Sequence, residues 1–258
     1  MSEASLILET RGLTKEFKGF TAVDGVDLQV RRGHIHALIG PNGAGKTTCF
    51  NLLTKFLTPT RGSIVFNGTD ITGEKPAEIA RRGVIRSFQI SAVFPHLTVL
   101  ENVRIGLQRF TGTSFHFWKG LTGLQQLDAK VLALLELVDL REMAHLKAGD
   151  LPYGRKRALE IATTMAMEPT LMLLDEPTQG MGHEDVERVT TLIKRVAEGR
   201  TVLMVEHNMK VVSRIADRIT VLARGAVLAE GDYAEVSKHP AVLEAYMGSE
   251  AAELQGAH

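Results

Sequence analysis

The sequence predicts an α/β fold with a mixed sheet at its core, an antiparallel β subdomain near the N-terminus and a helical insert. The segment Gly40–Thr48 is rich in glycine and lies between a strand-like and a helix-like stretch. The continuous apolar runs at 171–174 and 201–205 are typical of strands buried on both faces of a parallel sheet. From residue 89 to about 149, helical periodicity replaces these strand patterns.

The N-terminal part combines short strands with turn signals. Gly12 is expected to end the first strand in a turn, and the strand expected at 26–30 alternates as a half-buried strand does. The aromatic residues Phe17 and Phe20 lie in a stretch that is rich in turn-forming residues. We expect strands at 6–11, 26–30, 34–39, 63–66 and 84–88, and a helix at 49–53.

The insert is expected to be mainly helical. Thr98 is a suitable N-cap for a helix over 99–108, because Glu101 three residues later completes a capping box. Apolar residues on one helical face predict a second helix at 124–139. Between them, the aromatic-rich segment 110–123 either folds onto its own lobe or forms a contact patch for a partner.

The C-terminal part alternates helices with buried strands. A β-hairpin is expected around Arg224-Gly225, and the polar end from Ala251 is expected to fray. Helices are expected at 155–167, 184–197 and 208–216, and hairpin strands at 218–222 and 226–230.

Composition limits the class of protein. The chain has 258 residues, 44% of them hydrophobic and 23% charged, as in ordinary globular proteins. Its 30 basic and 30 acidic residues balance, so bulk attraction to nucleic acid or an anionic membrane is not expected. No apolar run approaches a membrane span, and the N-terminus lacks the basic region of a secretory signal. The single cysteine, Cys49, excludes an internal disulfide and suits the core of a cytoplasmic protein.

Gly40–Thr48 fits the pattern G-x-x-x-x-G-K-[ST] of a phosphate-binding loop without a mismatch. Its glycines let successive N–H groups approach a phosphate, and the following helix directs its positive end to the same place. Lys46 supplies a charge for the outer phosphates, and the Thr47 hydroxyl can ligate Mg²⁺. The chain is therefore expected to bind a nucleoside triphosphate through Asn42, Gly43, Ala44, Gly45, Lys46, Thr47 and Thr48.

Two carboxylates, Asp175 and Glu176, follow the apolar run at 171–174. A strand of a doubly wound sheet brings its C-terminal end to the ligand crevice. Asp175 is then expected beside Mg²⁺, directly or through water, and Glu176 where a base for the attacking water belongs. The alternative is a helix cap or a surface pair that follows a strand.

Together these motifs resemble the ATPase subunit of an ATP-binding-cassette (ABC) transporter, in the family's order and over nearly the whole chain. Gln89 corresponds to the glutamine at the entry to the helical insert, and Leu151–Arg155 to the signature usually written L-S-G-G-Q. His207 corresponds to the switch histidine after the next strand. The resemblance implies an ABC-ATPase fold of the P-loop NTPase class, with a nucleotide-binding core lobe at 1–88 and 157–258 and a helical subdomain at 89–156 that carries the signature.

The resemblance also implies residue roles. Phe17 matches the aromatic that stacks on adenine, the alternative being a packed loop aromatic. Gln89 is similar to the residue that senses Mg²⁺ and the attacking water, and His207 matches the histidine that hydrogen-bonds the γ-phosphate. Glu206 is expected to be solvated or locally bonded. The implied catalytic residues are Lys46, Gln89, Glu176 and His207, and the implied Mg²⁺ residues are Thr47, Gln89 and Asp175.

Two segments depart from the family pattern. In the family, the signature contacts the γ-phosphate of the partner subunit, which assigns this trans role to Pro152, Tyr153, Gly154 and Arg155. Pro152 offers neither a hydroxyl nor an N–H, whereas the N–H of Gly154 and the helix N-terminus can still bind an anion. Gly182 replaces an Asp that makes cross-dimer hydrogen bonds in the family.

The tyrosine-containing signature, and Glu-His-Asn-Met-Lys from residue 206, resemble ATPases of branched-chain (hydrophobic) amino acid importers, some of which handle amides or urea. The resemblance implies hydrolysis of ATP with Mg²⁺ at the cytoplasmic face of the inner membrane. It implies membrane permeases and a second ATPase subunit, identical or different, and indirectly a periplasmic or extracellular binding protein. The ATPase does not touch the cargo, so its sequence does not identify it.

Two other classes of function are less consistent with this sequence than transport. A soluble cassette ATPase that acts on nucleic acid or ribosomes usually carries two cassettes or a long coiled-coil insert, and this sequence has neither. A nucleotide-regulated binding module without turnover is disfavoured by the presence of Gln89, Glu176 and His207. The sequence therefore favours a transport ATPase that does not act on nucleic acid.

Overall fold

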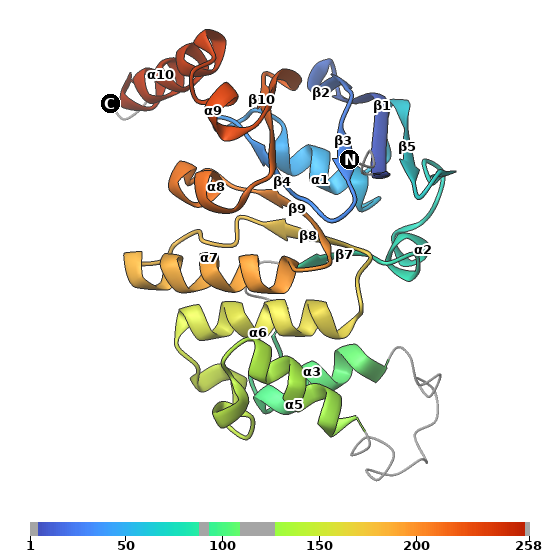
Figure 1. Ribbon diagram of the computed structural model, residues 1–258. Coiled ribbons are helices and arrows are strands. Elements are labelled where there is room, and N and C mark those ends of the chain that lie inside the picture. Colours follow the sequence, from blue (N-terminus) through green and yellow to red (C-terminus); the bar gives the residue numbers. More distant parts are fainter. Residues whose placement is uncertain (1–4, 88–92, 109–126, 256–258) are drawn as a thin grey trace.

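The computed structural model describes residues 5–87, 93–108 and 127–255, with side chains as far as residue 247. Figure 1 shows its arrangement: a small N-terminal sheet, a central sheet, helix α7 (His183–Ala197) below the central sheet, and further helices beyond α7. Within the described ranges no helix has both the length and the apolar character needed to cross a membrane.

The central sheet has six strands in the order β11-β10-β4-β9-β8-β7. Neighbouring strands from β10 to β7 run parallel, and only β11 is antiparallel, so the mixed sheet predicted from the sequence is confirmed. The strands are β7 (Val84–Ser87), β8 (Leu171–Asp175), β9 (Thr201–Val205), β4 (Ile35–Ile39), β10 (Arg218–Ala223) and β11 (Ala226–Gly231).

Strands β4, β8 and β9 are buried at every position. Their side chains alternate between two hydrophobic clusters, because successive residues of a strand point to opposite faces. One face packs against helices α6 (Tyr153–Ala166), α7 and α8 (Met209–Ile215), and the other against α1 (Lys46–Leu53) and the N-terminal sheet. Each buried Leu or Val contributes about 1.5–3 kcal/mol, so this sheet anchors the fold.

The N-terminal sheet is antiparallel, as predicted. It contains β1 (Leu6–Phe17), β2 (Phe20–Val26), β3 (Gln29–Arg31), β5 (Arg61–Phe66) and β6 (Thr69–Asp70), and is followed by helix α2 (Pro76–Arg81).

The predicted turn at Gly12 is wrong, since β1 continues through it to Phe17. Gly12 adopts a positive φ of 56° and lies within a register shift of β1 against β5, which is how a glycine accommodates a bulge. Its N–H donates to Asp27 Oδ1 at 2.6 Å. The strand predicted at 26–30 is accordingly interrupted at Asp27 and Leu28, where Leu28 N–H donates to the Thr10 hydroxyl oxygen at 2.9 Å.

The helices farthest from the N-terminal sheet are α3 (Val99–Gln108), α5 (Asp128–Leu137) and α6. The predicted capping box is confirmed: Thr98 N–H donates to Glu101 Oε2 at 2.7 Å, and Glu101 N–H donates to Thr98 Oγ1 at 3.2 Å. The whole of the predicted segment 110–123 and the first three residues of the helix predicted at 124–139 lie outside the described residues. Single 3₁₀ turns at 141–143 and 148–150 connect α5 to α6.

At the C-terminus, the predicted hairpin around Arg224-Gly225 is confirmed by the pairing of β10 with β11. Helix α9 (Tyr233–Val236) follows, and then α10 (Pro240–Gln255), which projects from the molecule in Figure 1. The helix continues past Ala251, where fraying was expected.

A buried polar chain crosses three strands of the central sheet. His36 of β4 is 1% exposed, and its Nε2 lies 2.8 Å from Thr220 Oγ1. The Thr220 hydroxyl donates to Glu230 at 2.9 Å, so it accepts from the protonated Nε2 of His36. Arg218 Nε donates to the same Glu230 carboxylate at 2.7 Å. Burial lowers the pKa of His36 to about 4, because the charged imidazolium is poorly solvated there.

This pKa predicts a loss of stability in acid. Between pH 6.5 and about 4, the unfolded chain, in which the histidine has a pKa of 6.5, binds more protons than the folded chain. The contribution of neutral His36 to folding stability is therefore fully present above pH 6.5 and is lost as the pH falls through this range. Between pH 7.5 and 5, His36 is expected to remove about 2 kcal/mol from the free energy of unfolding measured in urea.

The variant His36→Gln should lose correspondingly less stability over this range, whereas the exposed control His96→Gln should follow the unmodified chain. Parallel pH dependence in all three proteins would contradict the role of His36.

Candidate active site

The loop between β4 and α1 requires glycine at two positions. Gly40 has a φ of 148°, and a Cβ there would lie 2.1 Å from the carbonyl oxygen of Leu222. Gly45 has a φ of 97°, and its Cβ would lie 2.4 Å from the carbonyl oxygen of Ala22. Strands β10 and β2 therefore press so closely against the loop that a side chain would displace backbone on either side.

Hydrogen bonds fix the same loop to the β10–β11 hairpin. Gly225 N–H donates to Ala44 O at 3.1 Å, and Asp24 N–H donates to Gly225 O at 2.8 Å. A hollow of about 580 Å³ lies between the loop, the hairpin and helix α10. Tyr246 of α10 lies against the same loop: burial raises its pKa to about 12, and a hydrogen bond with the Gly40 backbone opposes this shift. Contacts with other parts of the chain therefore fix the conformation of the loop.

Lys46, the first residue of α1, directs its ammonium group into this loop. The side chain is 7% exposed, and Nζ donates to the carbonyl oxygens of Gly40 at 2.7 Å and Pro41 at 2.9 Å. Burial lowers the pKa of Lys46, while the nearby Glu176 and Asp175 carboxylates oppose that shift. The lysine and both predicted acidic residues therefore lie close enough to interact electrostatically.

The two carboxylates occur where strand β8 ends. Asp175 is its last residue, and Glu176 N–H donates to Val205 O of the neighbouring strand at 2.9 Å. Glu176 adopts a positive φ of 45°, an uncommon conformation for a residue with a side chain, which redirects the chain at this point. Asp175 is 5% exposed and forms an ion pair with Arg86 of β7. Arg86 also donates to Asn51 Oδ1 at 2.6 Å and was not anticipated from the sequence.

Arg157 of helix α6 is a second residue that sequence reasoning missed. It is buried, and it donates to the carbonyl oxygens of Asp175 and Glu176 at 2.9 Å and of Pro177 at 3.0 Å. Its charge is balanced by Glu160, whose pKa is raised by burial against the opposing effect of Arg157. One guanidinium thus holds three successive carbonyl groups of the segment that carries the acidic pair.

His207 lies exposed after strand β9, next to the end of β8. The prediction that Glu206 is solvated is wrong, because this residue is fully buried. The alternative half of that prediction, a local bond, holds in part, since Glu206 Oε2 accepts from His207 N–H at 2.9 Å. The same oxygen accepts from Asn208 N–H at 3.0 Å, which is also local. The partner that the neighbouring sequence did not reveal is Thr178, on the loop after β8.

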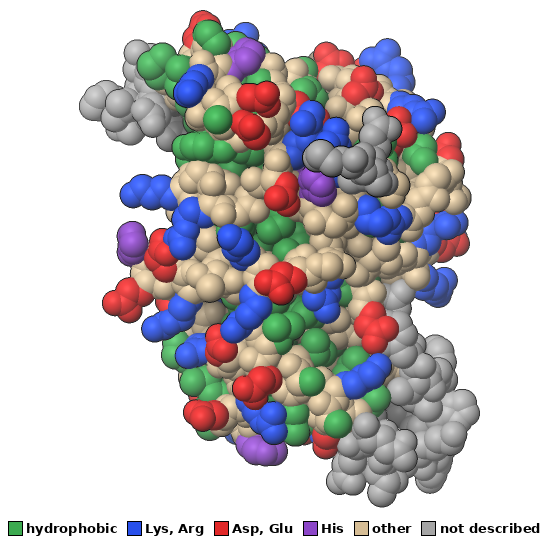
Figure 2. All heavy atoms as spheres, in the orientation of Figure 1, with side chains coloured by type: hydrophobic (Ala, Val, Ile, Leu, Met, Phe, Trp, Pro, Cys, Tyr) green, Lys and Arg blue, Asp and Glu red, His purple; other side chains and the backbone are tan. Residues whose placement is uncertain are grey.

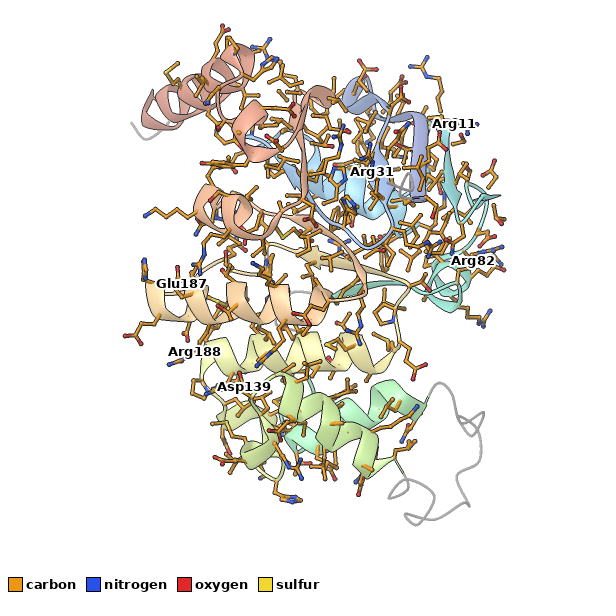
Figure 3. The ribbon with its side chains drawn as sticks, in the orientation of Figure 1. Arg11, Arg31, Arg82, Asp139, Glu187 and Arg188 are labelled. Carbon is orange, nitrogen blue, oxygen red and sulfur yellow. The ribbon has the colours of Figure 1, made fainter. Side chains whose placement is uncertain are left out.

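The signature residues lie at the start of α6. Pro152 is the N-cap, and Tyr153 Oη donates to Gln179 O at 3.0 Å, on the loop after β8. Arg155 Nη1 donates at 2.7 Å to the carbonyl oxygen of Asp139, which is labelled in Figure 3. A Cβ on Gly154 would lie 2.5 Å from the carboxylate of Asp185, so α7 packs closely here. Within one chain, Tyr153 therefore contacts the loop after β8, Gly154 lies against α7, and Arg155 contacts Asp139, which follows α5.

The remaining predicted residues occupy different surroundings. Phe17 ends β1 opposite Phe20, and both rings are exposed, at 41% and 66%. Lys15 Nζ lies 5.1 Å from the centre of the Phe17 ring. Gln89 lies outside the described residues. Gly182 is the N-cap of α7 and provides no side-chain cap.

The site fits a Mg²⁺ ion that is held jointly with a nucleotide. Thr47 is exposed at the start of α1, and Asp175 offers a carboxylate near the adjacent Lys46. Across the described ranges no three His, Cys, Asp or Glu residues form a potential all-protein metal site. Because Mg²⁺ commonly takes only one or two protein ligands together with phosphate oxygens and water, a hydroxyl and a carboxylate suit it.

Comparison with known proteins agrees with this architecture. A family model described as "ABC transporter" matches residues 23–179, more than half of the chain, so the chain belongs to the ABC transporter family. It is an ABC-type ATPase that binds adenine nucleotides as a component of a transporter. The chain is similar to a solved structure of an ATP-binding cassette of an ABC transporter in its ADP conformation. The two are 31% identical in sequence and superpose with a TM-score of 0.85, over 95% of this chain and 99% of the other.

Within the family, the chain falls in the branched-chain amino acid group. A model described as "Branched-chain amino acid ATP-binding cassette transporter" matches residues 226–252. The chain is 41% identical to the high-affinity branched-chain amino acid transport ATP-binding protein BraF of Pseudomonas aeruginosa, over 94% of this chain and 98% of BraF. It is 37% identical to LivG of Escherichia coli, described in the same words, with the same coverage of both chains.

The contacts of Arg157 predict a large effect on stability. Arg157→Met keeps much of the side-chain volume but leaves the Glu160 carboxylate buried without its ion-pair partner, so the free energy of unfolding should fall by about 3–5 kcal/mol. Urea denaturation followed by circular dichroism measures this change. The matched control, Arg155→Met, removes a more exposed arginine from the same helix and should cost less than about 1 kcal/mol. Equal losses in the two variants would contradict the assigned role.

Proposed function

We propose that this chain hydrolyses ATP at the loop between β4 and α1 and that hydrolysis energises the import of branched-chain or other hydrophobic amino acids. The observation that carries the proposal is the juxtaposition of a buried ammonium group with two carboxylates beside a preformed phosphate-binding loop. Lys46 interacts with Asp175 and Glu176 at the ends of parallel strands. Such strand ends are where open α/β sheets bind and transform ligands.

In this proposal the phosphates of ATP lie against the backbone N–H groups of residues 42–48. Lys46 then contacts the outer phosphates, exchanging its present carbonyl partners for phosphate oxygens. The exposed ring of Phe17 stacks on the adenine base. Thr47, Asp175 and Gln89 would hold Mg²⁺, which supplies charge that stabilises the phosphates as they react.

Glu176 is the proposed base. It polarises a water molecule whose oxygen attacks the γ-phosphorus, while the bond to the oxygen bridging the β- and γ-phosphates breaks, leaving ADP and inorganic phosphate. Glu176 accepts the proton released by the water. His207, exposed after β9, is proposed to hydrogen-bond the γ-phosphate. Both side chains follow neighbouring parallel strands, which supports their acting on one nucleotide.

We further propose that a second cassette, identical or different, completes each site. Pro152, Tyr153, Gly154 and Arg155 would face the partner's nucleotide, with Gly154 N–H and the start of α6 as anion donors. The 14-residue helix α6 has the length to direct a partial positive charge there. In this assembly the core lobe comprises 1–88 and 157–258, and the helical subdomain 89–156.

The proposed contact with membrane permeases is the helical insert near Gln89 and the segment at 90–98, of which the structure describes 93–98. This segment is held by Gly149 N–H, which donates to Pro95 O, and by Ala148 N–H, which donates to Leu97 O, both at 2.9 Å. Phe94 and Leu146 remain about half exposed, at 53% and 51%. A firmly held segment with exposed apolar side chains supports docking of a partner there.

Docking on permeases would place the chain peripherally on the cytoplasmic face of the inner membrane, with a periplasmic or extracellular binding protein acting only indirectly. Figure 2 shows basic and acidic side chains interspersed on the face in view, which gives no support to broad electrostatic binding of nucleic acid. The names of BraF and LivG support a branched-chain amino acid as cargo, and small amides remain the related class. Reconstitution with the permeases and a screen of these cargoes tests the proposal; co-purification with nucleic acid and no transport would contradict it.

Lys46→Ala is expected to weaken ATP binding at least about tenfold, because it removes a charge-assisted contact to the phosphates. Titration with a fluorescent ATP analogue measures the affinity. Lys194→Ala, which removes an exposed lysine from α7, is the matched control and should bind as the unmodified chain does. Unchanged affinity in Lys46→Ala would refute the assignment of the loop.

Glu176→Gln is expected to lower turnover at least about a hundredfold, because the amide cannot accept the proton of the attacking water. The variant should still bind ATP and accumulate as an ATP-bound dimer, detected by gel filtration with and without ATP. The control Glu184→Gln changes an exposed glutamate on α7. If Glu176→Gln hydrolyses ATP normally, Glu176 is not the base.

A further inference from the structure

Glu206 is a buried carboxylate that joins two loops. It directly follows β9 and is fully inaccessible to solvent. One oxygen, Oε1, accepts from the backbone N–H of Thr178 at 3.1 Å and from the Thr178 hydroxyl. The other, Oε2, accepts from the backbone N–H groups of His207 at 2.9 Å and Asn208 at 3.0 Å. Four donors from two segments therefore converge on one side chain.

The two segments carry the groups assigned to catalysis. Thr178 lies two residues after Glu176, and His207 immediately follows Glu206. The backbone N–H of Glu206 donates to Leu38 O at 3.4 Å, which places the same residue against β4, the strand that leads into the phosphate-binding loop. Glu206 therefore contacts all three strand ends from which the proposed site is built.

A carboxylate is chemically suited to this place. Burying it without compensation would be costly, and in the described structure no ion pair with a cation offsets that cost. Instead, hydrogen-bond donors face both of its oxygens. A glutamine of the same shape would accept at one end only, because its amide nitrogen would face donors at the other end. Neither an apolar side chain nor a neutral polar one of this size could accept from the donors that face both oxygens of Glu206.

We propose that Glu206 is a positioning residue that fixes His207 relative to Glu176 by joining the loops after β8 and β9. This inference rests on the proposed function, since it takes the roles of Glu176 and His207 from it. Glu206 itself touches neither the nucleotide nor the water in this scheme. Its loss is therefore expected to affect the chemical step and to spare the binding of ATP, which depends on the loop at Lys46.

The experiment compares variants of the full chain. Glu206→Gln should lower kcat about tenfold or more, as loss of a residue that orients a catalytic group does, while the affinity for a fluorescent ATP analogue stays within about twofold. Thr178→Val, which removes only the hydroxyl donor, should lower kcat less, and Thr178→Ser should restore it. Glu235→Gln is the matched control, because Glu235 also accepts a backbone N–H, from Asp232 at 3.0 Å, in the capping box of α9.

A double-mutant cycle separates positioning from a general structural role. If Glu206 acts by orienting His207, then Glu206→Gln combined with His207→Ala should be no slower than His207→Ala alone, within about twofold. Circular dichroism and thermal denaturation establish that each variant is folded. If Glu206→Gln does not fold, the Thr178→Val and Thr178→Ser pair, each combined with His207→Ala, carries the same test.

The outcomes are distinguishable. Normal kcat in Glu206→Gln, or losses that add fully to those of His207→Ala, would overturn the positioning role alone. Normal hydrolysis in Glu176→Gln or His207→Ala would instead overturn the proposed catalytic assignments. A reduced affinity for ATP equal to the reduction in kcat would mean that Glu206 supports the overall site and not the geometry of the chemical step.

Discussion

The satisfaction of buried charge at the carboxyl edge of the central sheet is the constraint on which this structure depends. Strands β8 and β9 are apolar except at their ends, and the charged residues Asp175 and Glu206 lie at their carboxyl ends. Each of these groups is desolvated and requires a partner from another segment. Arg86 supplies one for Asp175, Arg157 binds the carbonyl groups that follow, and Glu206 collects N–H groups from two loops.

This arrangement links the helices beyond α7 to the proposed site for chemistry. Arg157 lies four residues after Tyr153 on the same helix, and both reach the segment that follows β8. A displacement of α6 would therefore disturb the backbone at Glu176 as well as the signature residues. The link is made of hydrogen bonds within one chain, so it exists before any partner binds.

The features that could be predicted from sequence are those whose determinants are local. The glycine-rich loop between β4 and α1, the capping box at Thr98 and the hairpin at Arg224-Gly225 each depend on a few adjacent residues. The strands at 171–175 and 201–205 were predictable because a strand buried on both faces must be apolar throughout. The resemblance to the ABC family extended the prediction from these local features to the whole fold.

What escaped prediction depends on residues that are distant in sequence. In the sequence, Glu206 has the features of a solvated residue beside a histidine. Its partner Thr178 is 28 positions away and comes into contact only because β8 pairs with β9. Arg157 resembles any basic residue of a surface helix, although it is buried against Pro177. In the sequence, Gly12 is typical of a residue that ends a strand, and its place in a bulge depends on how β1 pairs with β5. In each case the missing information was the position of a partner segment that is distant in sequence.

The position of Cys49 has a practical consequence for studying how two such chains meet. It is the only cysteine in the sequence, it is fully buried in α1, and burial raises its pKa to about 12. A thiol with so little thiolate at neutral pH reacts slowly with electrophilic labels. A cysteine introduced at an exposed residue such as Gln179 would then be the sole reactive sulfur, and a spectroscopic probe could be attached there without first altering the helix that follows the phosphate-binding loop.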